Sequence, residues 1–245
     1  FVNAARGIAV QVQGAVTQFS TNFQTALNPQ ITKSYALGDF TYMHSLIFRS
    51  SKFTFLLLAV ISFPILLETE MILQLWLNMV PAYTVVFVRL MLCITIIDAM
   101  GGAFMVAAQS TGRVRFYQSV VGGILLAIVP VSYVVLRLGA APWSVFLIHF
   151  CVCTVAFFVR LFIIRSMIHL SLYSYFHAVL LRCLYVLLLA MPLPIGLLYI
   201  FPATLWAGIS VCFVSVLTIS LSSYRVGLAE GERKFIKEKI RMFLS

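Results

Sequence analysis

The sequence predicts an all-α integral membrane protein with about seven transmembrane helices. The chain of 245 residues is 62% hydrophobic and only 10% charged, whereas a soluble domain carries about 25% charged residues. Its mean hydropathy is +1.05. One water-soluble core cannot enclose so much apolar surface, so the composition excludes most classes of soluble enzyme and predicts a lipid environment.

Six apolar runs are long enough to cross a bilayer, which takes about 20 mostly apolar residues in a helix. These runs lie at roughly 46–67, 81–108, 114–138, 142–165, 178–200 and 203–223. Pro64, Pro130 and Pro192 fall near the ends of runs, where we expect them to kink the helices. A seventh segment, roughly 3–34, is also long enough to span, although its polarity hides it from a hydropathy search.

Lysine and arginine alternate along the connections between these segments. They are frequent in the first, third and fifth connections and in the tail beyond Tyr224, with the connections holding Lys33, Arg49, Lys52, Arg113, Arg115, Arg160, Arg165 and Arg182. The second and sixth connections hold neither, and the fourth holds only Arg137. Basic loops stay in the cytoplasm, so the alternation favours seven spans over six and predicts a cytoplasmic C-terminus.

The net charge of +10 follows from the same loop bias. Apolar spans separate the basic residues and no nucleic-acid-binding motif accompanies them, so we expect no nucleic-acid partner. The tail, 224–245, is basic and amphipathic. A helix there would collect its apolar side chains on one face, at Phe235, Ile236, Ile240, Phe243 and Leu244. We expect it to lie on the cytoplasmic leaflet as a membrane anchor rather than as a partner-binding helix.

Residues 11–30, QVQGAVTQFSTNFQTALNPQ, are far more polar than the rest of the chain. On a helical wheel the apolar side chains fall within one arc of roughly 100°, at Ile8, Val12, Val16, Phe19, Phe23, Ala26 and Leu27. The opposite face collects Arg6, Gln11, Gln13, Thr17, Gln18, Ser20, Thr21, Asn22, Gln24, Thr25 and Asn28. Asn28-Pro29 should bend or loosen this helix near its inner end.

Such a polar face cannot lie against lipid, because an unsatisfied amide in hydrocarbon costs several kcal/mol. Hydrogen bonding between helices accommodates one or two amides. A face this broad instead favours a helix that lines a water-filled cavity.

Charged residues within the apolar runs point to the same cavity. Arg89 and Asp98 are nine residues apart, which places them on roughly opposite faces of one helix. Asp98 could line the cavity or pair with an arginine of another helix, and we expect His149 to be neutral and hydrogen-bonded. Arg6 and Arg89, with Lys33 as a third candidate, oppose one membrane carboxylate, and such a surplus of positive charge attracts anions such as phosphate.

These considerations predict a substrate cavity lined by Arg6, Gln11, Gln18, Asn22, Gln24, Arg89 and Asp98. No catalytic residue, metal or cofactor is expected. The five cysteines lack the spacing and histidine neighbours of a zinc site, and four of them lie inside apolar runs. We expect all five to be packing residues.

Three segments carry a resemblance to a known family: NAARGIAVQVQGAVTQFSTNFQTALNPQITKSYALGD, LQLWLNMVPAYTVVFVRLML and AAQSTGRVRFYQSVVGGILL. They resemble bacterial polysaccharide repeat-unit flippases of the Wzx type, which belong to the multidrug/oligosaccharidyl-lipid/polysaccharide exporter superfamily. The resemblance covers nearly the whole chain and is densest from Asn3 to about Gly123. It is a running pattern rather than a short signature.

The resemblance implies a fold of two helical lobes around a central cavity, often followed by two further helices. Residues 1–165 would form the C-terminal lobe, 166–223 the two additional helices and 224–245 the tail. The first residue is Phe1, not methionine, and we expect an N-terminal lobe to precede this chain. Half of the cavity would then lie in that lobe, so this part alone should not transport.

The implied function is to move oligosaccharide linked to polyprenyl pyrophosphate across the bacterial cytoplasmic membrane by alternating access. Glycosyltransferases and a polysaccharide polymerase would be its partners beside the substrate and the bilayer. In this frame the polar helix contacts the glycan, while Arg89 and Arg6 meet pyrophosphate or acidic sugars.

Other functions remain open from the sequence. A cation-coupled multidrug exporter of the same superfamily needs a titratable carboxylate in its cavity, for which Asp98 is the candidate. A membrane-embedded glycan-modifying transferase would need a base, and His149, His169 and His177 have no nearby acid to orient them. A non-transporting scaffold does not account for the long polar face.

Overall fold

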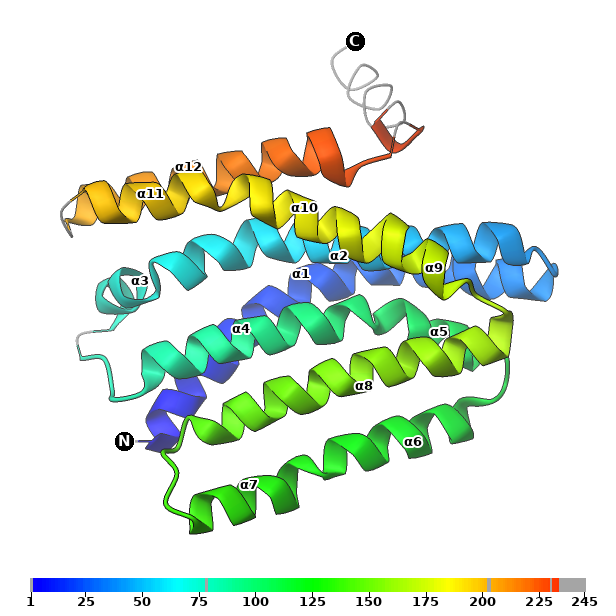
Figure 1. Cartoon of the computed structure of the whole chain (residues 1–245), viewed down its shortest axis with the longest axis horizontal. Helices are drawn as coiled ribbons and strands as arrows, with labels where there is room; N and C mark the ends of the chain where they lie inside the picture. Colours follow the sequence, from blue (N-terminus) through cyan, green and yellow to red (C-terminus); the bar gives the residue numbers. More distant parts are fainter. Residues whose placement is uncertain (1, 78, 202–203, 230, 234–245) are drawn as a thin grey trace.

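The computed structural model describes residues 2–77, 79–201, 204–229 and 231–233, and all regular structure within them is helical (Figure 1). The elements are α1 (Val2–Ala36), α2 (Phe40–Leu67), α3 (Thr69–Trp76), α4 (Thr84–Met100), α5 (Gly102–Ser110), α6 (Val114–Leu126), α7 (Ile128–Arg137), α8 (Ser144–Ile168), α9 (Leu172–Tyr175), the π-helical η1 (Phe176–Leu180), α10 (Leu181–Ala190), α11 (Pro192–Ile200), α12 (Leu205–Ser222) and the π-helical η2 (Ser223–Gly227). The predicted all-α class is confirmed.

Six helices of the described chain are long and apolar enough to cross a membrane. They are α2, α4 with α5, α6 with α7, α8, the run from α9 to α11, and α12 with η2. Each overlaps one of the six apolar runs of the sequence. The polar α1 is longer than any of them, at 35 residues, but its composition keeps it outside this set.

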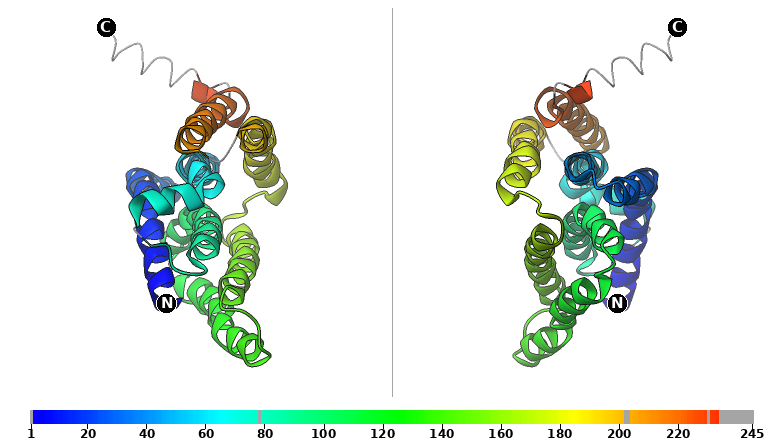
Figure 2. Two further views of the ribbon diagram at one scale, coloured as in Figure 1. Left: turned by 90° about the vertical axis from the view of Figure 1, so that its left-hand side faces the viewer. Right: turned by 90° about the vertical axis from the view of Figure 1, so that its right-hand side faces the viewer.

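The helices stack in tiers with α4 at the centre (Figure 1). Helix α4 packs against α1, α2 and α8. Apart from Arg89, Asp98 and its threonines, its side chains are apolar on every face, as is typical of a buried helix. The pair α6–α7 packs on the outer side of α8. Helices α10 to α12 cover the opposite edge, beside α2 (Figure 2).

The turns gather at two ends of the bundle, in the order that the sequence predicts. The chain reverses after α1, α5 and α8 at one end, where α12 also finishes, and after α3, α7 and α11 at the other (Figure 1). Lys33, Arg113, Arg165 and Arg225 lie at or beside the first set of turns. We refer to this end as the basic end. Arg160, counted above as a loop charge, lies instead within α8, where its side chain points into the bundle.

Proline accounts for two of the helix breaks. The missing N–H of Pro130 leaves the carbonyl of Leu126 without its usual donor, and α6 gives way to α7 at that point. Pro192 likewise follows the end of α10. Helix α1 continues through Pro29 to Ala36, so the expected loosening does not end the helix. The break between α4 and α5 has no proline and falls at Gly101.

Helix α1 buries a narrow stripe against α2 and α4. Its buried residues are Ala5, Ala9, Val16, Ser20, Ile31 and Ser34. Phe19, placed by the wheel in the apolar arc, is 54% exposed, because the small residues let α1 approach its neighbours along a slightly rotated line. Most of the amides and hydroxyls of α1 remain exposed on the side that does not pack against α2 and α4, which we call the open side.

The segment after α12 folds back onto α2. Glu232 is buried and its Oε2 lies 2.6 Å from Nζ of Lys52, which is only 4% exposed. The same oxygen accepts a hydrogen bond from the backbone N–H of Ala229 at 2.7 Å. This pair joins residues 180 positions apart, which no local pattern reveals. The predicted amphipathic face of the tail, from Phe235 to Leu244, lies outside the described residues.

Candidate functional site

A polar groove of about 430 Å³ lies between α1, α4 and α8. Nine of its lining residues are polar or charged: Gln13, Thr17, Ser20, Thr21 and Gln24 from α1, Thr95 and Asp98 from α4, and His149 and Arg160 from α8. Cys153 of α8 and Leu125 of α6 complete much of the wall. The groove therefore places one side of the polar face of α1, which does not include Gln11, Gln18 or Asn22, opposite the charged residues of two apolar helices.

Asp98 and Arg160 form an ion pair on the wall of this groove. Nη1 of Arg160 donates to Oδ1 of Asp98 at 2.7 Å. The Asp98 side chain is 57% exposed, whereas that of Arg160 is 14% exposed. The sequence left two roles open for Asp98, which were to line a cavity and to pair with an arginine of another helix. In the structure Asp98 does both. The buried Nε of Arg160 has no hydrogen-bond partner among the described residues.

Two glycines allow this close approach. An added Cβ at Gly101 would lie 2.8 Å from Nη1 of Arg160, and one at Gly102 would collide with the amide of Gln24. Both glycines stand at the break between α4 and α5. The backbone at this break has no side chains to cover it, so polar side chains from neighbouring helices reach it.

The amides of α1 separate into two groups. Gln11, Gln18 and Asn22 are exposed on the open side of the helix, and Nε2 of Gln18 donates to Oδ1 of Asn22 at 3.0 Å. Gln24, predicted to line the cavity in the same way, turns inward instead. Its Nε2 donates to the carbonyl oxygen of Ala99 at 2.7 Å and contacts Oγ1 of Thr54 at 3.3 Å. Gln24 thus lies in the wall of the groove and also links α1 to α4 and α2.

Arg89 does not line the groove, contrary to the prediction. It lies on the other face of α4, and its Nε donates to Oγ1 of Thr69 in α3 at 3.2 Å. Arg6 is exposed near the start of α1 and does not line the groove either. Asp98 and Arg160 balance each other within it, so the expected surplus of positive charge is absent from its described walls.

The sequence reasoning missed Arg160, Gln13 and Thr17 as groove residues. The sequence counts Arg160 among the charges of the fifth connection, whereas the residue lies within α8, eight residues before its end. Gln13 and Thr17 were recognised as polar but not singled out. Their spacing with Ser20 and Gln24, at intervals of three and four, was the available signal.

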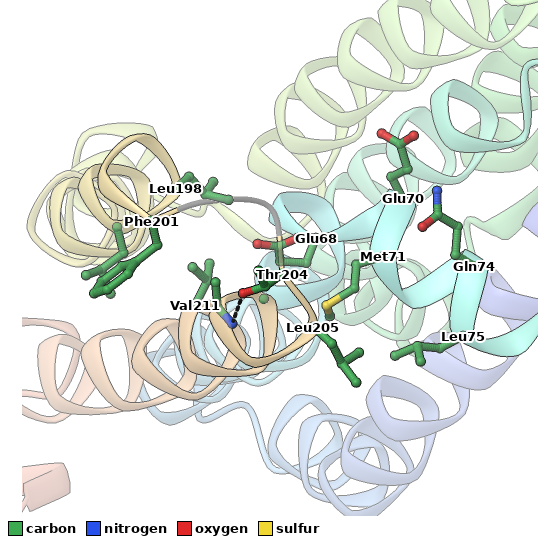
Figure 3. Close-up of a pocket in the computed structure, with 13 residues that line it drawn as sticks. Glu68, Glu70, Met71, Gln74, Leu75, Leu198, Phe201, Thr204, Leu205 and Val211 are labelled. Carbon is green, nitrogen blue, oxygen red and sulfur yellow. Dashed lines mark hydrogen bonds between the residues drawn. The ribbon is translucent and has the colours of Figure 1, made fainter.

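A second groove, of about 480 Å³, lies between α3, α11 and α12, at the end opposite the basic one (Figure 3). Its wall combines Leu198, Phe201 and Leu205 with the carboxylate of Glu68 and the amide of Gln74. Helix α12 approaches α3 closely there, and the approach requires glycine at position 208. An added Cβ at Gly208 would collide with Sδ of Met71. This groove is separate from the polar one.

No group of three or more histidine, cysteine or acidic side chains is placed to hold a metal ion within the described residues. Comparisons with protein-family models, with curated proteins and with solved structures found no match to this chain. Any inference about the function of this chain therefore rests on the polar groove and on the resemblance of the three sequence segments.

Proposed function

We propose that this chain forms one lobe of a flippase that moves polyprenyl-pyrophosphate-linked oligosaccharide across the bacterial cytoplasmic membrane. The observation that carries the proposal is the polar groove between α1, α4 and α8. Polar and ionisable side chains among membrane helices are costly and mark substrate pathways. Transporters that work by alternating access bind substrate between helices, near the middle of the bilayer.

In this proposal α1 also crosses the membrane, so the chain has seven transmembrane helices rather than the six apolar ones alone. Its 35 residues reach about 52 Å at about 1.5 Å per residue, well beyond the hydrocarbon thickness of about 30 Å. Gln11, Gln18 and Asn22 are exposed on its open side and must meet water, substrate or protein rather than lipid. A second lobe facing this side would enclose them in a central cavity.

The polar residues on the exposed side of α1 and those that line the groove then have distinct roles. Gln11, Gln18 and Asn22 hydrogen-bond the hydroxyl groups of the glycan, whereas the lipid tail stays in the bilayer. Arg160 takes the anion-binding role first expected of Arg89, because its guanidinium lines the groove and its Nε is unpartnered within the described residues. Arg6, at the exposed start of α1, meets acidic sugars or pyrophosphate as the substrate enters or leaves.

The basic end is assigned to the cytoplasm because lysine and arginine concentrate in cytoplasmic loops. The C-terminus then also lies in the cytoplasm, and helices α9 to α12 form the two additional helices of the family. Glycosyltransferases that build the lipid-linked unit and a polymerase that consumes it are the partners of such a flippase.

Complementation tests the proposal. The full-length protein should restore surface polysaccharide in a strain that lacks its own flippase, and the Gln18→Leu/Asn22→Leu double variant should reduce export at least tenfold. Leu126→Ala, on the exposed surface of α6, is the matched control and should export normally. Failure of the wild-type protein to complement, or full export by the double variant at equal expression, would refute the proposal.

A cation-coupled multidrug exporter is the second candidate, because Asp98 presents a 57% exposed carboxylate to the groove. That function requires Asp98 to exchange protons or bind the cation. Drug resistance that the full-length protein confers and Asp98→Asn abolishes would establish the exporter. Glycan export that survives Asp98→Asn and fails in Arg160→Gln would exclude it.

A further inference from the structure

The break between α4 and α5 is held by side chains from three other helices. The carbonyl oxygen of Ala99 accepts from Nε2 of Gln24 in α1, at 2.7 Å. The carbonyl oxygen of Met100 accepts from Oγ of Ser51 in α2, at 2.8 Å. The preceding residue, Asp98, is paired through its carboxylate with Arg160 of α8. Three successive residues are thus bound from three directions.

These contacts occur where the backbone departs from regular helix. The N–H of Gly101 bonds to the carbonyl oxygen of Asp98 at 3.0 Å, and the N–H of Phe104 bonds to that of Gly101 at 3.1 Å. Both bonds reach three residues back rather than four as in an α-helix, so the carbonyl of Met100 loses Phe104 as its donor. Carbonyls freed at such a point need other donors, because hydrocarbon supplies none. Gln24 and Ser51 are those donors.

The fit of Gln24 depends on Gly102. An added Cβ at Gly102 would collide with Oε1, Cδ and Nε2 of Gln24, so the side chain occupies space that any other residue would fill. Two adjacent glycines in a helix are also a common origin of kinks. The sequence thus leaves α4–α5 free to bend here, and the bend is kept in place only by its neighbours.

We propose that Gln24 and Ser51 are positioning residues that hold a hinge at Gly101–Gly102. When their hydrogen bonds to Ala99 and Met100 break, α5 changes its angle to α4. Because α5 leads to the basic end, this motion alters the width of the polar groove on that side. The role of the hinge in transport rests on the function proposed above, whereas the hinge itself does not. Hinges in transporters and enzymes are formed by a few such residues at element ends.

Distance measurements across the break test the hinge. Spin labels at Val86→Cys in α4 and Gln109→Cys in α5, both exposed, are introduced into the full-length protein after its native cysteines have been replaced by serine. Electron–electron dipolar spectroscopy in lipid nanodiscs should give one narrow distance for the otherwise wild-type protein. Gln24→Ala should broaden it or add a second distance, because the carbonyl of Ala99 loses its donor.

Two matched pairs of variants keep the test specific. Gly102→Ala expels the Gln24 side chain and should reproduce the change, whereas Gly123→Ala, with nothing within 4 Å of an added Cβ, should not. Ser51→Ala should also broaden the distance, whereas the neighbouring buried Ser50, whose hydroxyl has no partner among the described residues, should tolerate alanine. An unchanged distance in both Gln24→Ala and Gly102→Ala would overturn the hinge.

The outcome for the hinge is independent of the outcome for transport. If the distances respond as expected while the full-length protein fails to complement a flippase-deficient strain, the proposed function is wrong and the hinge remains. If complementation succeeds and the distances do not respond, the hinge is wrong and the proposed function remains.

Discussion

Two of the three ion pairs among the described residues are short, and these two differ most in their access to solvent. Lys52 and Glu232 are 2.6 Å apart with side chains 5% and 9% exposed. Asp98 and Arg160 are equally close, at 2.7 Å, but their side chains are 57% and 14% exposed. The first pair is sealed between α2 and the segment after α12, and the second stands in the wall of the polar groove.

The difference in exposure separates a structural role from an exchangeable one. A sealed pair has no alternative partner, so breaking it leaves a buried charge without compensation. An exposed carboxylate can be solvated when its partner leaves, so its pairing adds little stability. In the proposed function Arg160 exchanges Asp98 for an anionic ligand, whereas Lys52 and Glu232 hold the segment after α12 against α2.

Removing the sealed carboxylate should have the largest effect on stability. Glu232→Gln leaves the ammonium group of Lys52 buried without a counter-charge, and we expect a loss of about 3–5 kcal/mol in the free energy of unfolding. The measurement is unfolding in mixed detergent micelles, followed by circular dichroism. Arg49→Ala is the control, because Arg49 is 51% exposed and 3.8 Å from Glu232; a loss as large as that of Glu232→Gln would contradict the assignment of the charge to Lys52.

Removing the groove carboxylate should cost far less. We expect Asp98→Asn to lower the free energy of unfolding by about 1 kcal/mol or less, because the carboxylate is mostly exposed. The same unfolding assay compares it directly with Glu232→Gln. Equal losses for the two variants would mean that Asp98 is sealed in the membrane and that the groove is not open to water.

A neutral hydrogen bond between residues next to both pairs gives a reference value for these losses. Ser51→Ala removes the hydroxyl donor of the Met100 carbonyl and should cost about 0.6 kcal/mol, a typical value for a hydrogen bond between membrane helices. Ser50→Ala removes a buried hydroxyl that lacks a partner among the described residues and should cost nothing measurable. Equal costs at the two serines would mean that the bond to Met100 contributes no stability.

Salt should produce the smallest effect and should act on one pair only. Mobile ions screen charges that are open to water, with a screening length of about 10 Å at about 0.1 M salt. The cost of Asp98→Asn should therefore shrink by a few tenths of a kcal/mol when salt is raised about tenfold. The cost of Glu232→Gln should not change, and a parallel decrease would show that water reaches Lys52.

The sequence predicted the helices well, because span length and helix breaking are local properties. Runs of apolar residues located the six apolar helices, and Pro130 marked a real break between α6 and α7. The separation of nine residues placed Arg89 and Asp98 on opposite faces of α4. Each of these properties depends only on residues within a few turns of one another.

The contacts of the site could not be predicted, because they depend on residues far apart in the chain. A helical wheel places Gln24 on the polar face of α1, but it cannot show that Gly102 leaves room for its amide. Arg160 looked like a loop residue because its partner, Asp98, lies 62 positions away. Lys52 looked like a loop charge for the same reason. In each case a distant residue decided where the side chain points.

The claim that the polar face of α1 meets water can be tested most directly by thiol labelling. Gln18→Cys in α1 and Leu126→Cys in α6 are both exposed on the described structure, but we assign the first to an aqueous cavity and the second to lipid. Maleimides react with the thiolate, which forms in water and not in hydrocarbon. In membranes that contain the full-length, otherwise cysteine-free protein, a soluble maleimide should label Gln18→Cys at least tenfold faster than Leu126→Cys. Equal rates, or faster labelling of Leu126→Cys, would contradict a water-filled cavity along α1.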